Sequence, residues 1–127
     1  MKILIADDSA DFRERIRNSV LRNQNVLVVG ECVNGIEAMQ LLKKTKPDMI
    51  ILDIRMPLMN GIQVLKKIKE QGISTISCIL TNYPSEQYRK RCLAEGADYF
   101  FNKSDDFEKF NLAVEKVSAN DETVSCD

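Results

Sequence analysis

Short apolar runs that each end at a polar residue constrain this 127-residue chain more than any other feature. The runs cover residues 3–6, 49–52, 76–80 and 99–101, and segments with helical spacing of apolar residues separate them. This alternation predicts parallel strands in one doubly wound α/β sheet. Ligands of such sheets bind at the carboxyl ends of the strands. The polar groups expected to meet at that edge are Asp7, Asp8, Asp53, Thr81 and Lys103.

The same patterns predict where the elements begin and end. The expected strands cover residues 2–6, 26–29, 48–53, 76–81 and 98–102. The expected helices run from an Asp8 or Ser9 cap to about 23, from about 35 to Pro47, from 61 to Gly72, from Ser85 to Gly96, and from Asp105 or Asp106 to Val117. We expect one domain over residues 1–118 and a polar, disordered tail over 119–127.

Composition excludes several classes of function. The chain has 18 basic and 19 acidic side chains, so its net charge favours neither nucleic acid nor an anionic membrane. Since it lacks both a signal-peptide pattern and an apolar run of about 20 residues, a cytoplasmic protein is expected. It also lacks histidine, which excludes Ser-His-Asp and Cys-His chemistry. Any phosphoryl or proton transfer must therefore use carboxylates, lysine or a partner's histidine.

The four cysteines are far apart and form no CxxC pair. This spacing predicts reduced packing residues rather than a disulfide framework or a zinc site. The residues concerned are Cys32, Cys78, Cys92 and Cys126.

Three carboxylates in one crevice repel one another, so they require either raised pKa values or a cation. Mg²⁺ satisfies that requirement, because it prefers carboxylates, waters and phosphate oxygens. With the charge neutralised, Asp53 can act as a nucleophile toward phosphorus. Lys103 and the Thr81 hydroxyl can stabilise the charge of the transferring group. Taken singly, each residue also fits a turn, a helix cap or a solvated surface charge; their joint placement after successive strands favours a site.

Four segments carry a resemblance to a known family: IADDS at residues 5–9, IILDIRMPLMNG at 50–61, ILTN at 79–82 and GADYFFNKS at 96–104. From about Lys2 to Val117 the chain resembles the receiver domain of two-component response regulators, the CheY-like superfamily. The resemblance implies a flavodoxin-like (βα)5 fold with the sheet order 2-1-3-4-5. The switch point of that order lies between the first and third strands.

The resemblance also implies roles for individual residues. Asp53 would accept the phosphoryl group. Asp8, Asp53 and the backbone carbonyl of Arg55 would bind Mg²⁺, or Mn²⁺ in its place, and Asp7 would act through water. Thr81 would follow the phosphoryl group, and Lys103 would hold one of its oxygens.

Phe100 matches the family's switch aromatic, although a strand with one buried face explains it equally. For Phe101 we expect packing alone. Two positions depart from the family pattern: Ser104 stands where many receivers have proline, and Asn82 stands where a small residue is common. Arg55 and Tyr83 match the two positions that flank the phosphoryl group in the family. Their bulk predicts slow hydrolysis, while a plain surface arginine and tyrosine are the alternative.

Basic residues on two helices fit either a solvated surface or a docking face. The first expected helix resembles the family's kinase-contact element and carries Arg13, Arg15, Arg17 and Arg22. The fourth would belong to the family's output face and carries Arg89, Lys90 and Arg91.

The sequence as a whole predicts a single-domain receiver that takes its phosphoryl group from a histidine kinase or a histidine phosphotransfer protein. Output would be by contact with a downstream protein or by phosphorylation-dependent dimerisation, without a DNA-binding module. A phosphorelay intermediate and a fragment of a longer regulator are alternatives. An aspartyl-phosphate phosphohydrolase is disfavoured, because Arg55 stands where such enzymes carry a second aspartate. A scaffold without phosphorylation is disfavoured by the complete acceptor set.

Overall fold

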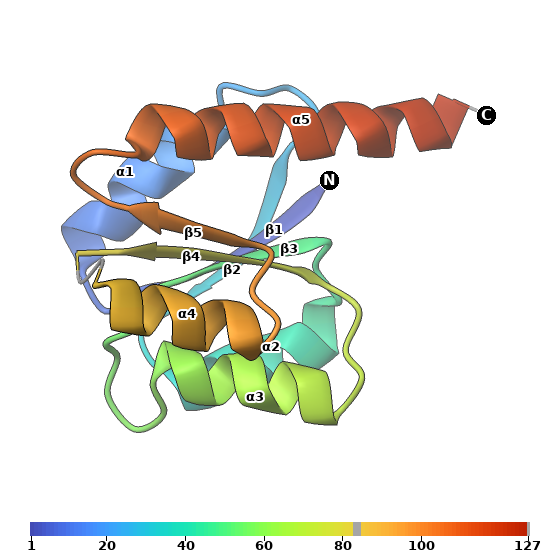
Figure 1. Ribbon diagram of the computed structural model, residues 1–127. Helices are drawn as coiled ribbons and strands as arrows, with labels where there is room; N and C mark the ends of the chain where they lie inside the picture. The colour runs from blue at the N-terminus through green and yellow to red at the C-terminus, as the bar shows by residue number, and fades with distance from the viewer. Residues whose placement is uncertain (83–84, 127) are drawn as a thin grey trace.

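Five parallel strands form the centre of the molecule (Figure 1). The structure is a computed structural model that describes residues 1–82 and 85–126, with side chains to residue 119. The strands are β1 (Lys2–Ala6), β2 (Leu27–Cys32), β3 (Met49–Leu52), β4 (Ile76–Thr81) and β5 (Tyr99–Asn102). The helices are α1 (Ala10–Val20), α2 (Gly35–Thr45), α3 (Gly61–Glu70), α4 (Glu86–Ala94) and α5 (Phe107–Cys126).

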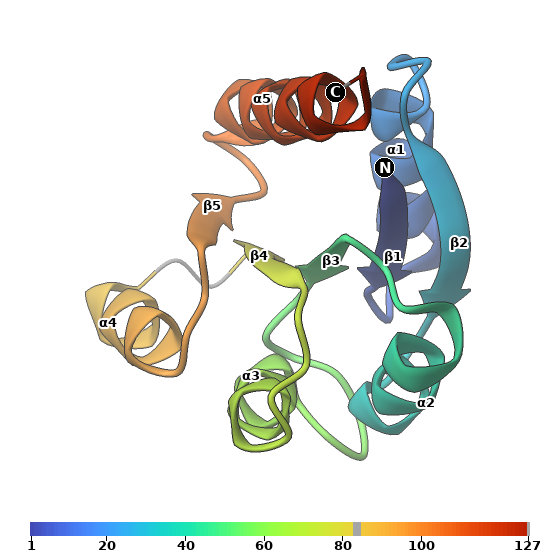
Figure 2. The ribbon, with the colours of Figure 1, turned by 90° about the vertical axis from the view of Figure 1, so that its right-hand side faces the viewer.

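The strand order is β2-β1-β3-β4-β5, with every pair parallel. The expected doubly wound, flavodoxin-like fold is therefore confirmed. Helices α1 and α5 cover one face of the sheet, and α2, α3 and α4 cover the other (Figure 2). Because both faces are covered, the strands are nearly continuous apolar runs. Along β1, Ile3 and Ile5 pack beneath α1 and α5, whereas Leu4 and Ala6 belong to the core on the opposite face.

Side-chain caps start the helices that lead away from the carboxyl edge. The Ser9 hydroxyl accepts a hydrogen bond from the Phe12 amide at the start of α1, so Ser9, rather than Asp8, is the cap. The side chain of Asn34 caps α2 in the same way. Asn60 and Gln63 form a capping box at the start of α3. These caps fix the turns that carry the polar residues of the edge.

The end of α1 and the end of β2 differ from the expected bounds. Helix α1 ends at Val20 rather than near residue 23. The amide of the next residue, Leu21, donates hydrogen bonds to the carbonyls of Arg17 and Ser19. Strand β2 continues to Cys32 rather than ending at residue 29. Strand β2 pairs with β1 as far as Cys32, which lies opposite Ala6. Gly30 weakens the local strand signal, so this pairing extends β2 beyond what its own sequence indicates.

The carboxyl-terminal helix is longer than expected. Its backbone continues to Cys126, whereas the apolar spacing ends at residue 117 and a disordered tail was expected from 119. The domain boundary at residue 118 stays a prediction. No helix in the described part of the chain has the length and hydropathy needed to cross a bilayer. The cytoplasmic location also stays a prediction.

Three cysteines are free and buried, as expected of packing residues: Cys32, Cys78 and Cys92. The side chain of Cys126 lies outside the described residues.

Candidate functional site

The acidic residues meet where β1 and β3 end. Asp7 and Asp8 follow β1, and Asp53 follows β3. The two strands are paired up to the Ala6–Leu52 register, and the Asp53 amide donates a 3.0 Å hydrogen bond to the Ala6 carbonyl. One carboxylate oxygen from each aspartate lies within 4.8 Å of the others. Asp7 and Asp53 are buried, whereas Asp8 is exposed.

Lys103 reaches this acidic cluster from the end of the edge strand β5. Its Nζ lies 2.7 Å from Oδ2 of Asp7 and 3.0 Å from Oδ2 of Asp53. Only 4% of the lysine is exposed. The residue follows β5, and its amide donates a 2.9 Å hydrogen bond to the carbonyl of Thr81, the fully buried last residue of β4. The structure therefore brings the three aspartates and the Lys103 ammonium together, and a backbone bond ties Thr81 to Lys103 at the same edge.

Backbone donors orient two of the carboxylates. The Ile54 amide donates a 2.7 Å hydrogen bond to Oδ1 of Asp53. The Ser9 amide donates a 2.9 Å hydrogen bond to Oδ1 of Asp7. In both aspartates Oδ2 is thus turned toward Lys103.

Charge is unevenly balanced in this cluster. Burial raises the pKa of Asp7 more than the adjacent ammonium lowers it. For Lys103, burial lowers the pKa, but the contacts with Asp7 and Asp53 outweigh it and the net shift is upward. One ammonium faces three carboxylates, and Oδ2 of Asp7 accepts no well-aligned hydrogen bond from any described residue. A buried carboxylate oxygen with spare capacity, beside two more carboxylates, fits a hard divalent cation.

Two glycines hold the loop between Asp53 and α3. The Gly61 amide donates a 2.8 Å hydrogen bond to the Ile54 carbonyl, and a Cβ at Gly61 would lie 2.2 Å from the Asp53 carbonyl oxygen. The Gly35 amide donates a 2.9 Å hydrogen bond to the Met59 carbonyl, and a Cβ at Gly35 would lie 2.2 Å from that Met59 oxygen. Both contacts require glycine, because any side chain would displace the loop.

The aromatic residues of β5 face different cores. Phe100 is 8% exposed and packs in the core beneath α2, α3 and α4. Phe101 packs on the opposite face, with its ring 6.4 Å from that of Phe110 in a T-shaped arrangement. This agrees with the packing role expected for Phe101, while the switch role of Phe100 stays a prediction. The side chains of Asn82 and Arg55 are exposed, and Tyr83 lies outside the described residues.

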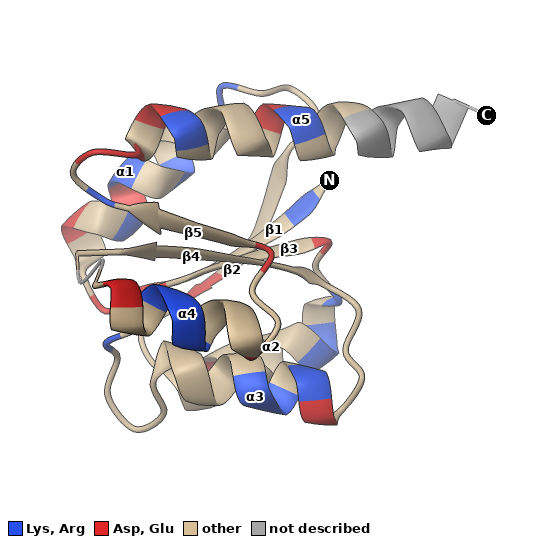
Figure 3. Cartoon of the chain, in the orientation of Figure 1, with Lys and Arg blue, Asp and Glu red and all other residues tan. Residues whose placement is uncertain are grey.

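Arginines of α1 make contacts that local spacing did not indicate. Arg13 donates a 2.7 Å hydrogen bond to the Asp7 carbonyl, and both Arg13 and Arg17 form ion pairs with Glu31. Arg15 lies 4.2 Å from the centre of the Phe107 ring. By contrast, Arg89, Lys90 and Arg91 are exposed on α4 (Figure 3).

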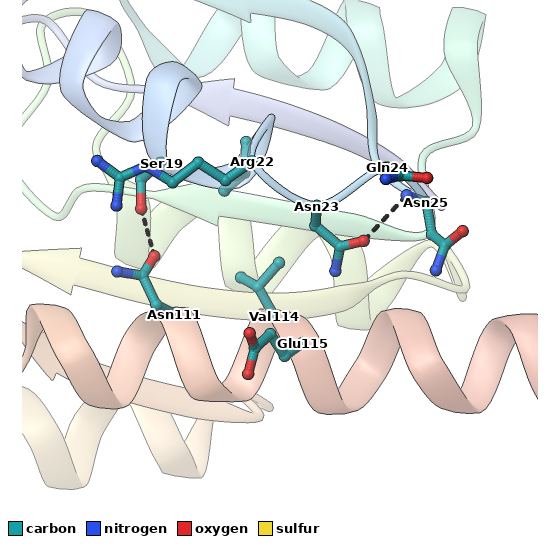
Figure 4. Close-up of a pocket in the computed structure, with 9 residues that line it drawn as sticks. Ser19, Arg22, Asn23, Gln24, Asn25, Asn111, Val114 and Glu115 are labelled. Carbon is teal, nitrogen blue, oxygen red and sulfur yellow. Dashed lines mark hydrogen bonds between the residues drawn. The ribbon is translucent and has the colours of Figure 1, made fainter.

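A hollow of about 540 Å³ lies between α5 and the chain after α1. Amide side chains line much of it, including Asn23, Gln24, Asn25 and Asn111 (Figure 4). It lies beside the last turn of α1, whereas the acidic cluster lies before the first. The hollow therefore takes no part in the site at the carboxyl edge.

A doubly wound sheet that collects three carboxylates and a buried lysine at its carboxyl edge is the arrangement expected of the receiver class of signalling domains. The family description of the response regulator receiver domain matches residues 3–115, and the chain belongs to this family.

Individual relatives agree with this assignment. The transcriptional regulatory protein YhcZ of Bacillus subtilis is 38% identical over 76% of this chain and 45% of its own length. A protein-glutamate methylesterase/protein-glutamine glutaminase of Clostridium acetobutylicum is 36% identical over 81% of this chain and 30% of its own length. The chain therefore spans less than half of either relative.

Among solved structures, a chain of the CheX-CheY-BeF3-Mg²⁺ complex from Borrelia burgdorferi superposes with a TM-score of 0.80. It is 29% identical, and the match covers 92% of this chain and 88% of that one.

Proposed function

We propose that this receiver accepts a phosphoryl group on Asp53 and signals through contact with another protein. The observation that carries the proposal is the position of the Lys103 ammonium between Asp7 and Asp53, with Asp8 beside them. The donor would be the phosphohistidine of a kinase or of a phosphotransfer protein, because this chain has no histidine of its own.

In the proposed transfer, a carboxylate oxygen of Asp53 attacks the phosphorus atom of the donor. The new O–P bond forms as the bond from phosphorus to the leaving group breaks, and its electron pair stays on the imidazole nitrogen of phosphohistidine or on the acetate of acetyl phosphate. Lys103 stabilises the negative charge on the phosphoryl oxygens, and the Thr81 hydroxyl donates to one of them once the chain has adjusted.

Asp8, Asp53 and the Arg55 carbonyl would hold Mg²⁺ or Mn²⁺, with Asp7 acting through water. When bound, the ion supplies positive charge that neutralises the carboxylates and the phosphoryl oxygens. The presence of Mg²⁺ and BeF3 in the similar Borrelia complex supports this choice of cation.

Acetyl phosphate with Mg²⁺ tests the proposal without a protein donor. We expect one acid-labile phosphoryl group per chain, detected by intact mass. Asp53→Asn should abolish the label by removing the acceptor, and Asp8→Ala should abolish it by removing a metal ligand. Asp11→Asn is a matched control, because Asp11 is an exposed aspartate of α1 outside the acidic cluster. Labelling that persists in Asp53→Asn would place the acceptor elsewhere.

The greater length of the relatives favours a second candidate, the receiver part of a longer regulator. Both candidates share the chemistry at Asp53. The mass of the native polypeptide in its source cells, measured with an antibody against this domain, separates them. A phosphorelay role predicts a further step, in which the phosphorylated protein transfers its group to a second protein's histidine.

A further inference from the structure

Besides its two carboxylates, Lys103 contacts an aromatic ring. Its Nζ lies 4.1 Å from the centre of the Phe12 ring, which projects from the first turn of α1. A cation at this distance from a ring is attracted by the negative charge of the ring face. The attraction is stronger in a site that excludes water, and Lys103 is almost entirely buried.

Neighbouring side chains hold the Phe12 ring in place. Phe107 of α5 contacts it in a T-shaped arrangement, with 6.0 Å between ring centres and an angle of 74°. The guanidinium of Arg15 lies 5.5 Å from the centre of the Phe12 ring. The ring also packs at the border of the core between α1, α5 and the sheet. Side chains of α1 and α5 therefore hold the Phe12 ring with its face toward Lys103.

The chemistry of the ring matters because a lysine ammonium has only three hydrogen-bond donors. Asp7 and Asp53 lie within reach of two of them. The face of the Phe12 ring attracts the positive charge of the Lys103 ammonium. The ring has no lone pair, so it does not occupy the third N–H donor as a conventional hydrogen-bond acceptor would. That donor remains available for an oxygen of the incoming phosphoryl group.

We propose that Phe12 is a positioning residue for phosphoryl transfer, which holds the Lys103 ammonium at the acidic cluster while leaving a donor for the phosphoryl oxygen. This inference rests on the proposed function. It adds to that function a residue of α1 that acts through Lys103.

The test compares three variants with acetyl phosphate as the donor, because a small donor removes any effect of α1 on protein docking. Phe12→Leu keeps an apolar side chain but removes the ring, and it should slow labelling of Asp53 by about threefold or more. Phe12→Tyr keeps the ring face and should retain most of the wild-type rate. Phe101→Leu removes a half-buried ring from the same core, where that ring contacts Tyr99 and Phe110, and should also retain most of the rate.

Proton NMR of the Lys103 side chain provides a readout that general packing would not change. Its methylene protons should be shifted upfield by the Phe12 ring in the wild type and in Phe12→Tyr, and the shift should be lost in Phe12→Leu. Urea unfolding of each variant identifies any loss of rate that reflects stability alone. The absence of an upfield shift in the wild type overturns the inference even if a variant fails to fold.

The remaining outcomes separate this inference from the proposed function. An unlabelled wild-type protein overturns both. A labelled wild type together with a Phe12→Leu variant of equal rate overturns the role of Phe12 alone. Equal slowing by Phe12→Leu and Phe101→Leu also overturns it, because the effect would then come from loss of apolar packing.

Discussion

The backbone amide of Lys103 donates a 2.9 Å hydrogen bond to the carbonyl of Thr81, so the ends of β4 and β5 are tied together at the acidic edge. The parallel pairing of β4 and β5 leads up to this bond, with Ile79 opposite Phe100 and Thr81 opposite Asn102. A displacement of Thr81 toward a phosphoryl group is therefore expected to reach β5 directly.

Thr81→Ala should uncouple phosphorylation from the conformational change. The phosphoryl group adds about −1.5 to −2 charges, and the lost hydroxyl is one of its expected donors. With beryllofluoride as a phosphoryl mimic, wild-type NMR shifts should extend over residues 85–103 and include Phe100, Arg89, Lys90 and Arg91. In Thr81→Ala those distant shifts should shrink, while Thr81→Ser, which keeps the hydroxyl, should preserve them. Shifts confined to the loops around Asp53 in the wild type would contradict the switch.

Lys103→Met should destabilise the protein by about 3 kcal/mol without metal, because it leaves Asp7 and Asp53 buried without a positive partner. The measurement is urea unfolding at neutral pH, and added Mg²⁺ should recover part of the loss. Lys109→Met is the matched control, since Lys109 is exposed and lies 3.7 Å from its Asp106 partner. That variant should change stability by less than about 1 kcal/mol. Equal effects of the two substitutions would contradict the prediction.

Phosphorylated Asp53 should decay slowly, because the family resemblance predicts that Arg55 and Tyr83 flank the phosphoryl group, where their bulk would obstruct an in-line water. Arg55 is exposed two residues after Asp53. Arg55→Asn combined with Tyr83→Glu should speed decay, measured by loss of the label after removal of the donor. An unchanged or slower decay would show that these residues do not control water access.

Gly35→Ala should displace the loop between Asp53 and α3, because its Cβ would lie 2.2 Å from the Met59 carbonyl oxygen. We expect weaker Mg²⁺ binding by calorimetry and a loss of stability of about 1–3 kcal/mol. Gly30→Ala is the same substitution in a site where the nearest atom is the flexible Leu4 Cδ1, 3.3 Å away. It should leave Mg²⁺ binding unchanged. Normal binding by Gly35→Ala would show that the contact does not position the loop.

Stability should fall as pH rises above about 8.5, the ordinary pKa of a cysteine thiol. Burial raises the pKa of Cys92 to about 11 and that of Cys32 to about 12. Between these values the unfolded chain loses thiol protons that the native state keeps, so rising pH favours unfolding. Urea unfolding from about pH 7 to about pH 10 measures the decline. It should be shallower in a Cys32→Ala, Cys92→Ala variant, and an equal slope would contradict the assignment to these thiols.

Features encoded over a few neighbouring residues were predictable from the sequence. The four apolar runs and the apolar residues at 26–29 indicated all five strands and their sheet class, since buried strands and amphipathic helices have different periods. The Ser9 cap and the polar strand ends were also visible, because both depend on residues that are adjacent in the chain. The boundaries of β2 and α5 were less accurate, because pairing with β1 and packing on the sheet extend them beyond their local signals.

The tertiary structure alone decided which groups touch. Lys103 contacts an aspartate 50 residues earlier, and Arg13 bonds the carbonyl of Asp7 rather than facing solvent. The placement of Phe12 beneath the Lys103 ammonium likewise depends on α1, α5 and the end of β5 meeting at one corner. Strand register sets such distances, and local sequence patterns do not specify it, because pairing energy is shared among residues far apart in the chain.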